Sequence, residues 1–421
     1  MARSEALLGE ADLSRLGPLR EREFRLLFIG QTTSRLGSAM APVALAFAVL
    51  NTLDGSPTDL GLILTARQIA VLALLLFGGV WADRLPRHQV MVVSNLLSGA
   101  SQATVAVLLL AGHATLWELT ALAVVNGASS AFFFPASNGI VPQTVPVGLL
   151  QQANATLRLA TNITNVTGLA IGGIIVAATS PGVAIAVDAV SYIVAAGALW
   201  SMRLPAGLRM AGSSVLHELR VGWHDFWSRP WLWAVVLQFG IVNAAETGVV
   251  NVLGPDVAKK HLGGAAGWAA ILTAMTLGVI ACGVMMLRWQ PRRILRVATY
   301  SVFSLAIILV ALAIPAPLPV VIVGAFLTGF GIEIFGVLWD TTYMQEIPQE
   351  LLSRIASYDA LGSWVLMPIG YAVAGPIAAA IGTRATFIGA AVLILVATSL
   401  VFLSRDVRTL ERRLVPQDVA A

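Results

Sequence analysis

Ionisable side chains stand inside several long apolar runs of this 421-residue chain. A charged side chain at the centre of a membrane-spanning helix costs about 2.5–3.5 kcal/mol, so such a residue usually has a partner or a function. A buried carboxyl can bind and release a proton, and a guanidinium can pair with a carboxylate or hold an anionic ligand. The candidates are Arg35, Arg67, Arg158, Asp188, Glu246, Glu333 and Asp340.

Glu333 has the most informative neighbours. Gly329, Glu333, Gly336 and Asp340 are separated by four, three and four residues, so they share one face of a helix. Small residues beside an acid leave room for water or a ligand, and desolvation favours a neutral carboxyl. We therefore predict that Glu333 is a proton-coupling group and that Gly329 and Gly336 line a ligand cavity. Glu246 is the second proton-coupling candidate. The alternative for Glu333 is a buried acid that a neighbouring arginine or the backbone satisfies.

Arg35 and Arg67 suit two roles. They could pair with Asp188 and Glu246 from other apolar runs, or they could hold an anionic group of a ligand. We favour pairing, and both arginines remain candidates for the lining of a ligand cavity. Asp188 lies within a few turns of the end of its run, so we interpret it as structural.

Motifs of other chemistries are missing from the sequence. It contains no G-x-x-x-x-G-K-[ST] loop, no H-E-x-x-H pair and no nucleophile elbow. Its single cysteine, Cys282, allows neither a disulfide framework nor a thiolate metal site. We therefore predict that the chain is not an enzyme, that it needs no cofactor or metal, and that an ion or substrate gradient supplies its energy.

The elements that position these residues are predicted from composition. The chain is 57% hydrophobic and only 11% charged, against about 25% charged residues in soluble domains. The apolar runs are long and continuous rather than alternating, so they indicate transmembrane helices of about 20 residues. We place these spans at 24–50, 59–82, 88–111, 115–138, 151–178, 181–203, 231–254, 265–287, 294–314, 317–341, 353–380 and 384–404.

The basic residues predict the orientation of the spans. Most arginines fall in alternate loops and in the two tails, whereas the other side holds only Lys259, Lys260 and Arg384. Cytoplasmic loops carry the excess of arginine and lysine, so both termini are predicted to be cytoplasmic. The same clustering explains the basic composition without a nucleic-acid partner.

The chain divides at its longest polar stretch. We predict a tail over 1–23, a helical bundle over 24–203, a linker over 204–230, a second bundle over 231–404 and a tail over 405–421. Within the linker, Leu216, Leu219, Trp223, Phe226 and Trp227 recur at helical spacing. This pattern indicates an amphipathic helix at the membrane surface, as a passive connection or, less in keeping with the pattern, as a regulatory latch.

The two halves of the chain repeat each other. Gln143 to Leu150 reads like Gln345 to Leu352, and the same offset pairs several glycines and polar residues. Those pairs are Gly127 with Gly329, Asn138 with Asp340, Gly168 with Gly370 and Gly173 with Gly375. Two homologous bundles would enclose a cavity near the middle of the bilayer, so Asn138 is a further cavity candidate.

The loop after the second span carries the clearest motif. Gly79, Asp83, Arg84 and Arg87 match the loop signature G-x-x-x-D-R-x-G-R-[RK], with Pro86 in place of its glycine and His88 in place of its last basic residue. With the repeat, this resembles the major facilitator superfamily of secondary transporters. The resemblance implies an all-α polytopic membrane protein with twelve transmembrane helices in two pseudo-symmetric six-helix bundles.

The same resemblance suggests a gate at the cytoplasmic surface. Asp83 could accept hydrogen bonds from the free N–H groups at the start of span eleven, near 352–355. Asp340 ends span ten and Arg354 begins span eleven, so we predict an ion pair between them. The predicted gate residues are Gly79, Asp83, Arg84, Arg87, Asp340 and Arg354.

Span five contains a glycine pattern that also resembles a family motif. Gly168, Gly172 and Gly173 match the antiporter signature G-P-x-x-G-G, with Leu169 in place of proline. Ordinary close packing of helices explains these glycines equally well. Two other features of proton antiporters are absent. Span four has Ala123, Asn126 and Gly127 where many have R-x-x-Q-G, and Ser38 rather than an acid follows Gly37.

The stretches Arg20 to Gly37 and Trp339 to Thr341 resemble bacterial exporters that include macrolide-efflux and enterobactin-export proteins. We therefore expect a proton-coupled exporter of an amphipathic small molecule, acting by alternating access as a multi-pass monomer in the cytoplasmic membrane. Its partners would be the substrate, protons and the lipid bilayer. A siderophore exporter, a proton-coupled nutrient importer and a non-transporting scaffold or sensor remain the alternatives.

Overall fold

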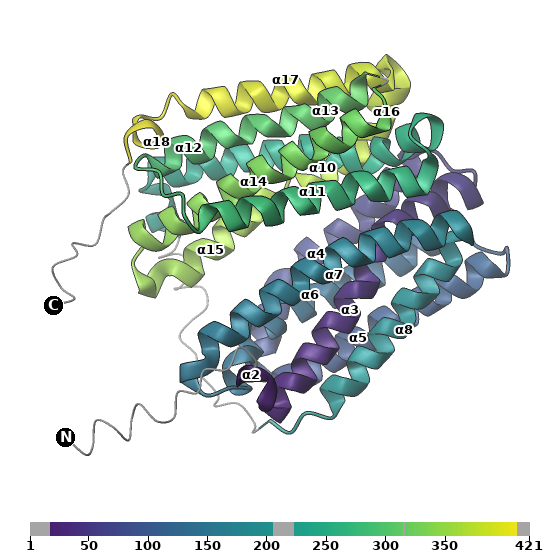
Figure 1. The fold of residues 1–421 in the computed structure, drawn as a ribbon, viewed down its shortest axis with the longest axis horizontal. Helices are drawn as coiled ribbons and strands as arrows, with labels where there is room; N and C mark the ends of the chain where they lie inside the picture. The colour runs from purple at the N-terminus through teal and green to yellow at the C-terminus, as the bar shows by residue number, and fades with distance from the viewer. Residues whose placement is uncertain (1–16, 205–222, 315, 411–421) are drawn as a thin grey trace.

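The computed structural model describes residues 17–204, 223–314 and 316–410; within these ranges the side chains of 76–84, 349–350, 352–354 and 356–357 are not described. The first half forms one bundle of long helices, the lower one in Figure 1. Its elements are α2 (Gly17–Arg20), α3 (Arg22–Phe47), η1 (Ala48–Thr52), α4 (Pro57–Arg84), α5 (Arg87–Leu110), α6 (Leu116–Ile140), η2 (Val141–Gln143), η3 (Val147–Leu149), α7 (Leu150–Ala178) and α8 (Pro181–Trp200).

The second half forms the upper bundle in Figure 1. Its elements are α10 (Pro230–His261), α11 (Gly264–Met286), α12 (Ile294–Ser301), η4 (Val302–Ser304), α13 (Leu305–Ala313), α14 (Leu318–Glu346), α15 (Gln349–Trp364), α16 (Met367–Ile381), α17 (Thr383–Val401) and α18 (Arg405–Thr409). Among the described residues, twelve helices are long and apolar enough to cross a membrane. The predicted architecture of two six-helix bundles is confirmed.

Two predicted spans are interrupted. Span nine is split into α12 and α13 by the short turn η4, and span eleven is split into α15 and α16. Pro368, in the first turn of α16, has no backbone N–H and cannot donate to the carbonyl one turn earlier. The proline therefore explains why span eleven begins a new helix at this point.

The helices begin where their sequences supply caps. Thr115 and Glu118 form a capping box at α6, in which each side chain meets the backbone of the other residue. Ser180 accepts a hydrogen bond from the backbone N–H of Val183 at the start of α8. At the turn before α11, Gly263 has a φ of +80°, a conformation that favours glycine.

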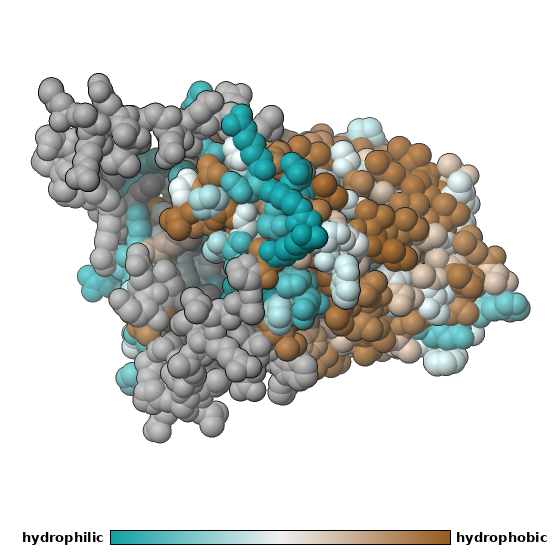
Figure 2. All heavy atoms as spheres, turned by 90° about the horizontal axis from the view of Figure 1, so that it is seen from below, coloured by the Kyte–Doolittle hydropathy of each residue, from teal (hydrophilic) through white to brown (hydrophobic). Residues whose placement is uncertain are grey.

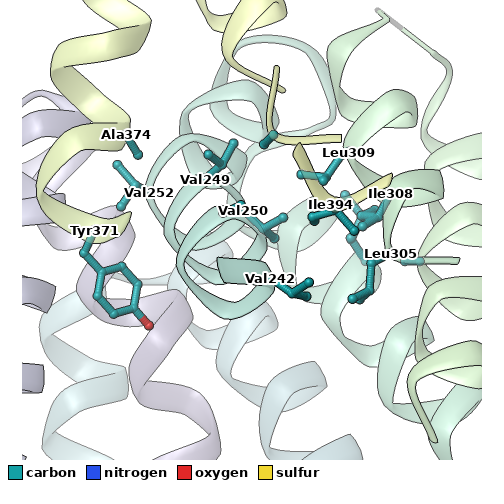
Figure 3. Close-up of a cluster of buried hydrophobic side chains, with 14 of the residues drawn as sticks. Val242, Val249, Val250, Val252, Leu305, Ile308, Leu309, Tyr371, Ala374 and Ile394 are labelled. Atoms are coloured by element: carbon teal, nitrogen blue, oxygen red, sulfur yellow. The ribbon is translucent and has the colours of Figure 1, made fainter. Parts of the chain in front are cut away.

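Each bundle is filled by aliphatic side chains. Figure 3 shows part of this core in the second bundle, where Val250 of α10, Leu309 of α13 and Ile394 of α17 pack together. On the outside, a broad area of hydrophobic side chains covers much of the right half of the face seen in Figure 2. Such a surface suits contact with lipid, because only apolar side chains avoid a cost in the hydrocarbon region.

The two ends of the molecule differ in charge. Elements α2 and α18 lie at one end, which we call the α18 end, and the opposite end holds η1 and is called the η1 end (Figure 1). Basic residues described at the α18 end are Arg20, Arg22, Arg25, Arg87, Arg203, Arg229, Arg288, Arg292, Arg293, Arg296, Arg405 and Arg408. Those at the η1 end are Lys259, Lys260 and Arg384.

The bundles meet closely at the η1 end. A Cβ atom on Gly173 of α7 would lie 2.1 Å from Cβ of Ala269 of α11, and one on Gly375 of α16 would lie 2.6 Å from Cα of Thr58 of α4. Gly173 and Gly375 are one of the pairs that the sequence repeat relates. Lys259 also donates a hydrogen bond of 2.5 Å to the backbone carbonyl of Leu50 in the other bundle.

The end of the linker packs on the second bundle. Residues 223–227 are helical, and the rings of Trp223 and Phe226 lie 5.5 and 6.0 Å from the ring of Tyr358 in α15. Leu216 and Leu219 of the predicted amphipathic helix lie outside the described residues.

Candidate functional site

Two cavities lie between the bundles. The first, the α18-side cavity, has a volume of about 610 Å³ and is lined from α3, α6 and α7 of one bundle and from α11 and α14 of the other. The second, the η1-side cavity, has a volume of about 260 Å³ and is lined mainly from the first bundle, with α10, α11 and α16 closing its other side.

The α18-side cavity combines charged, polar and apolar side chains. Arg35 of α3, Arg158 of α7 and Glu333 of α14 line it, together with Asn138 of α6. The Nε atom of Arg35 is buried and has no hydrogen-bond partner among the residues that the structure describes. An unpartnered guanidinium nitrogen costs free energy unless a ligand or water satisfies it, so this cavity is suited to bind an anionic or hydrogen-bond-accepting group.

Glu333 stands beside two glycines and one arginine. A Cβ atom on Gly283 of α11 would lie 4.0 Å from its Oε1, and one on Gly336 would lie 3.8 Å from its Oε2. Arg158 is within electrostatic reach of Glu333, and it also reaches Asp340. The carboxyl therefore has free space beside it and one cation nearby, without an ion pair between Glu333 and another described residue.

Gly329 is placed differently from the cavity position that its spacing suggested. It is buried where α14 crosses α11, and a Cβ atom there would come 1.9 Å from the backbone oxygen of Met275. It lines neither of the two cavities. Its role is helix packing, because only a residue without a side chain allows so close a crossing.

Asp340 has Arg158 as its nearby cation. Its side chain is exposed near the end of α14, and Arg158 comes from α7 of the other bundle. The side chain of Arg354, its predicted partner, lies outside the described residues.

The η1-side cavity holds a set of neutral polar groups around one arginine. Arg67 of α4 donates a hydrogen bond of 3.1 Å from Nε to Oδ1 of Asn126 of α6. Asn126 also hydrogen-bonds Tyr192 of α8. Across the cavity, Tyr371 of α16 hydrogen-bonds Asn251 of α10. The arginine is thus held by amides and phenols rather than by an acid.

Asp188 lies behind this cavity and is completely buried. Gln102 of α5 donates from Nε2 to its Oδ2 at 2.7 Å, and Ser38 of α3 lies 3.5 Å from its Oδ1. The prediction that Arg35 and Arg67 pair with Asp188 and Glu246 is not met in the described residues: no ion pair joins them. Amide and hydroxyl donors on neighbouring helices satisfy Asp188 instead.

Glu246 lies in α10, away from both cavity linings. Its Oε2 accepts a hydrogen bond of 3.1 Å from the hydroxyl of Thr247. Tyr371 is within electrostatic reach. This second proton-coupling candidate therefore lacks the direct contact with a cavity that Glu333 has.

The loop motif is described only in part. Arg87 donates a hydrogen bond to the backbone carbonyl of Gly139 in α6 of the same bundle, and its guanidinium fills the space that a side chain at Gly139 would need. Arg87 thus ties α5 to the end of α6. The side chains of Gly79, Asp83 and Arg84 lie outside the described residues, as does the predicted contact of Asp83 with 352–355.

The glycines of span five pack against two different helices. Cβ atoms on Gly168 and Gly172 would meet Leu36, Ala39 and Met40 of α3 at 2.5–2.9 Å, within the same bundle. Gly173 faces α11 of the other bundle. Close packing of helices accounts for all three positions, which is the alternative that the sequence left open.

Sequence reasoning missed the polar residues that complete the η1-side cavity. Gln102, Tyr192, Asn251 and Tyr371 each stand inside an apolar run and line this cavity. Each is neutral, so the rule that ionisable residues are rare inside spans does not single them out. A search for hydrogen-bonding side chains inside spans could have found them, because these too are costly in lipid without partners.

Comparison with known proteins decides the family of this architecture. The sequence profile described as Major Facilitator Superfamily matches residues 27–365. The chain belongs to the major facilitator superfamily. It is therefore a multi-pass membrane transporter rather than an enzyme, as its motifs predicted.

Several superfamily members named as efflux proteins are similar over almost their whole length. "Multidrug efflux pump Tap" of Mycolicibacterium fortuitum is 27% identical over 396 residues, covering 90% of this chain and 95% of that protein. The protein of the same name from Mycobacterium tuberculosis strain H37Rv is 25% identical over 399 residues, with 89% and 91% covered. "Macrolide efflux protein A" of Streptococcus pyogenes is 20% identical over 400 residues, with 92% and 97% covered.

Solved superfamily structures share the fold. The nucleoside transporter NupG has a TM-score of 0.71 at 12% identity, covering 90% of this chain and 98% of that chain. A bacterial homolog of the human lysosomal transporter Spinster has a TM-score of 0.70 at 15% identity, with 94% and 99% covered. At these identities the likeness concerns the fold alone.

Proposed function

We propose that this transporter exports an amphipathic small molecule across the cytoplasmic membrane in exchange for protons. The observation that carries the proposal is the α18-side cavity, where apolar side chains such as Leu157 and Ile280 stand beside Arg35, Arg158 and Glu333. A mixed lining of this kind suits a molecule with an apolar body and a few polar groups. The relatives named as efflux pumps support the direction of transport.

Glu333 is the proposed proton-coupling group. It is the acid that lines the larger cavity, and the two glycines beside it leave room for water. Arg158 lies within electrostatic reach of this carboxyl and would attract its ionised form. Proton binding would weaken this attraction, so protonation of Glu333 and substrate binding can influence one another. Glu246 is the second candidate.

The proposed orientation places the α18 end in the cytoplasm. The basic residues gathered at this end follow the distribution of cytoplasmic loops. The close contacts of Gly173 and Gly375 at the η1 end would then seal the outer side. The conformation would accept substrate from the cytoplasm or the inner leaflet, and rocking of the bundles would release it outside. The monomer would contain the whole transport path.

An exporter of an anionic natural product, such as a siderophore, is the second candidate. Arg35 lines the α18-side cavity and Arg67 lines the η1-side cavity. Neither forms an ion pair with a described residue. Two available cations along the path favour cargo that carries a carboxylate or a similar group.

Transport by purified protein in proteoliposomes tests the proposal. An imposed pH gradient should drive movement of at least one of erythromycin, ethidium and the catecholate enterobactin, and dissipating the gradient should stop it. Labelled sugars and amino acids should not move. A pH gradient that drives none of these exported probes but drives nutrient uptake would replace the exporter by an importer, and no movement of any solute would favour a scaffold or sensor.

A further inference from the structure

We infer that Asp188 is a second proton-binding site, which serves the η1-side cavity through the hydroxyl groups of Ser38 and Tyr192. The inference rests on the proposed proton coupling and extends it to a residue that the sequence marked as structural. It is drawn from the burial of the acid, from the nature of its neighbours and from their position on the cavity wall.

Asp188 is buried among side chains from three helices. Asp188 has an exposed fraction of 0%, and the groups that hydrogen-bond its carboxyl come from Gln102 of α5, Ser38 of α3 and Ser191 of α8. All three are uncharged. A structural carboxylate buried in a membrane protein is normally paired with a cation, because an isolated buried charge costs several kcal/mol. Among the described residues, no cation forms an ion pair with Asp188.

The neighbours of Asp188 can satisfy both protonation states of its carboxyl. A carboxylate only accepts hydrogen bonds, whereas a protonated carboxyl also donates one. Ser38 has a hydroxyl that can donate or accept, and Gln102 can present either its NH₂ group or its oxygen. The carboxyl can therefore gain or lose a proton without leaving a buried polar atom unpaired, which an arginine partner would not allow.

Ser38 connects Asp188 to the wall of the η1-side cavity. Ser38 Oγ lies 2.9 Å from the hydroxyl oxygen of Tyr192 as well as 3.5 Å from Asp188 Oδ1. Ser38, Gln102 and Tyr192 line the η1-side cavity, whereas Asp188 does not. A proton that leaves Asp188 can pass by way of Ser38 and Tyr192 to water in this cavity. The hydroxyl of Ser38 thus lies between the acid and the η1-side cavity.

Further polar and charged groups face Asp188. Its own helix contributes Tyr192 and Ser191, and the Ser191 hydroxyl donates a hydrogen bond of 2.7 Å to the backbone oxygen of Asp188. From α4 comes Arg67, which reaches Asp188 electrostatically and is joined to Tyr192 through Asn126. Loss of the proton would create a negative charge that Arg67 attracts. Protonation of Asp188 can therefore alter how strongly Arg67 binds an anionic group of a substrate.

The absence of a side chain at Gly37 lets α3 lie close to Asp188. A Cβ atom at position 37 would lie 2.7 Å from Asp188 Oδ1 and 2.1 Å from Ser191 Oγ. A side chain here would push the carboxyl away from Ser38. The residue pair Gly37 and Ser38 thus provides both the space and the hydroxyl that the site needs.

Infrared spectroscopy of the full-length protein tests the site directly. A protonated carboxyl has a carbonyl band separate from the amide bands, and carbon-13-labelled aspartate should shift it. The wild type should show such a band that disappears on raising the pH, and Asp188→Asn should lack it. Glu333→Gln and Asp256→Asn should keep it; Asp256 is a largely buried acid that is paired with Lys260 at 2.7 Å. A wild-type spectrum without an aspartate band that responds to pH, or one that Asp188→Asn leaves unchanged, would overturn the inference.

Transport assays separate this inference from the proposed function. In proteoliposomes, Asp188→Asn should lose erythromycin efflux driven by a pH gradient but retain exchange of labelled for unlabelled erythromycin, which needs no net proton movement. Asp188→Glu, which keeps a carboxyl, should restore part of the driven efflux and should retain the infrared band. If wild-type protein moves no probe, the proposed function fails while the infrared result still decides the proton site. If Asp188→Asn couples as well as wild type, the site fails while the function stands.

Discussion

Gly375 of α16 lies directly against Thr58 of α4, so that a Cβ atom on the glycine would come 2.6 Å from Thr58 Cα. Gly173 makes the corresponding contact with Ala269 between α7 and α11. A repeat in the sequence thus becomes two equivalent contacts that hold the bundles together at the η1 end. Neither contact leaves room for a side chain at its glycine.

We predict that Gly375→Val and Gly173→Val open the η1 end. Overpacking costs about 1–3 kcal/mol. This corresponds to a shift of roughly fivefold to 150-fold in the ratio of molecules with the bundles in contact at the η1 end to molecules with the bundles apart there. Distances between spin labels on the two bundles at this end should lengthen. Gly389→Val is the control, because nothing lies within 4 Å of a Cβ atom there. Equal distance distributions in the variants and the control would contradict the sealing role.

A second prediction concerns Glu333. Replacing it by glutamine keeps the size of the side chain but removes its ability to bind and release a proton, so transport driven by a pH gradient should fall about a hundredfold or more. Exchange of erythromycin without a gradient should continue. Glu118→Gln is a matched control, since a glutamine preserves a capping box. Driven transport at the wild-type rate in Glu333→Gln would remove this residue from the coupling mechanism.

The third prediction concerns Arg35, whose buried Nε has no hydrogen-bond partner among the described residues. Arg35→Gln should weaken binding of an anionic substrate by roughly tenfold to a hundredfold, since hydrogen bonds to charged groups contribute about 1.5–3 kcal/mol. Binding of the cation ethidium should weaken far less. Ligand affinity measured by tryptophan fluorescence checks this, with Arg408→Gln, at an exposed position of α18, as the control. Similar losses for anionic and cationic ligands would point to a structural role for Arg35.

A fourth prediction concerns the core of the second bundle. Leu309 is completely buried among the side chains in Figure 3, so Leu309→Ala should destabilise the protein by about 2–5 kcal/mol through lost packing. Leu400 has an exposed fraction of 57% and is available to lipid. Leu400→Ala should therefore lower the midpoint of thermal unfolding in detergent much less. Equal shifts would mean that this cluster contributes little to stability.

The fifth prediction concerns orientation. Cys282, the native cysteine, is buried, so introduced cysteines can be labelled over a low background. A maleimide that cannot cross membranes should label His113→Cys, in the loop at the η1 end, on intact cells. It should label Arg408→Cys, at the α18 end, only after the membrane is opened. The reverse pattern would place the α18 end outside and turn the proposed transport direction around.

The sequence by itself determined the fold class, the two halves and the identity of most intramembrane charges. A segment that spans the lipid must be apolar and helical. This requirement applies to each segment separately, so the residues of a segment are enough to identify it. The repeat that relates Gly173 to Gly375 likewise needed no structure. The sequence did not predict the interruptions within spans. Hydropathy measures how apolar a segment is, and it carries no information on the new helix that has Pro368 in its first turn.

Only the tertiary structure decided which polar groups meet. The sequence predicts that Arg67 pairs with a buried acid, yet Arg67 contacts Asn126, 59 positions away, and Asp188 contacts Gln102, 86 positions away. Gly329 and Glu333 share a helix, but one packs on Met275 while the other reaches a cavity. Periodicity gives the face of one helix and carries no information on which helix lies opposite. Because a hydrogen bond depends on distances of a few ångströms between such helices, the partners follow from the packing of the bundles.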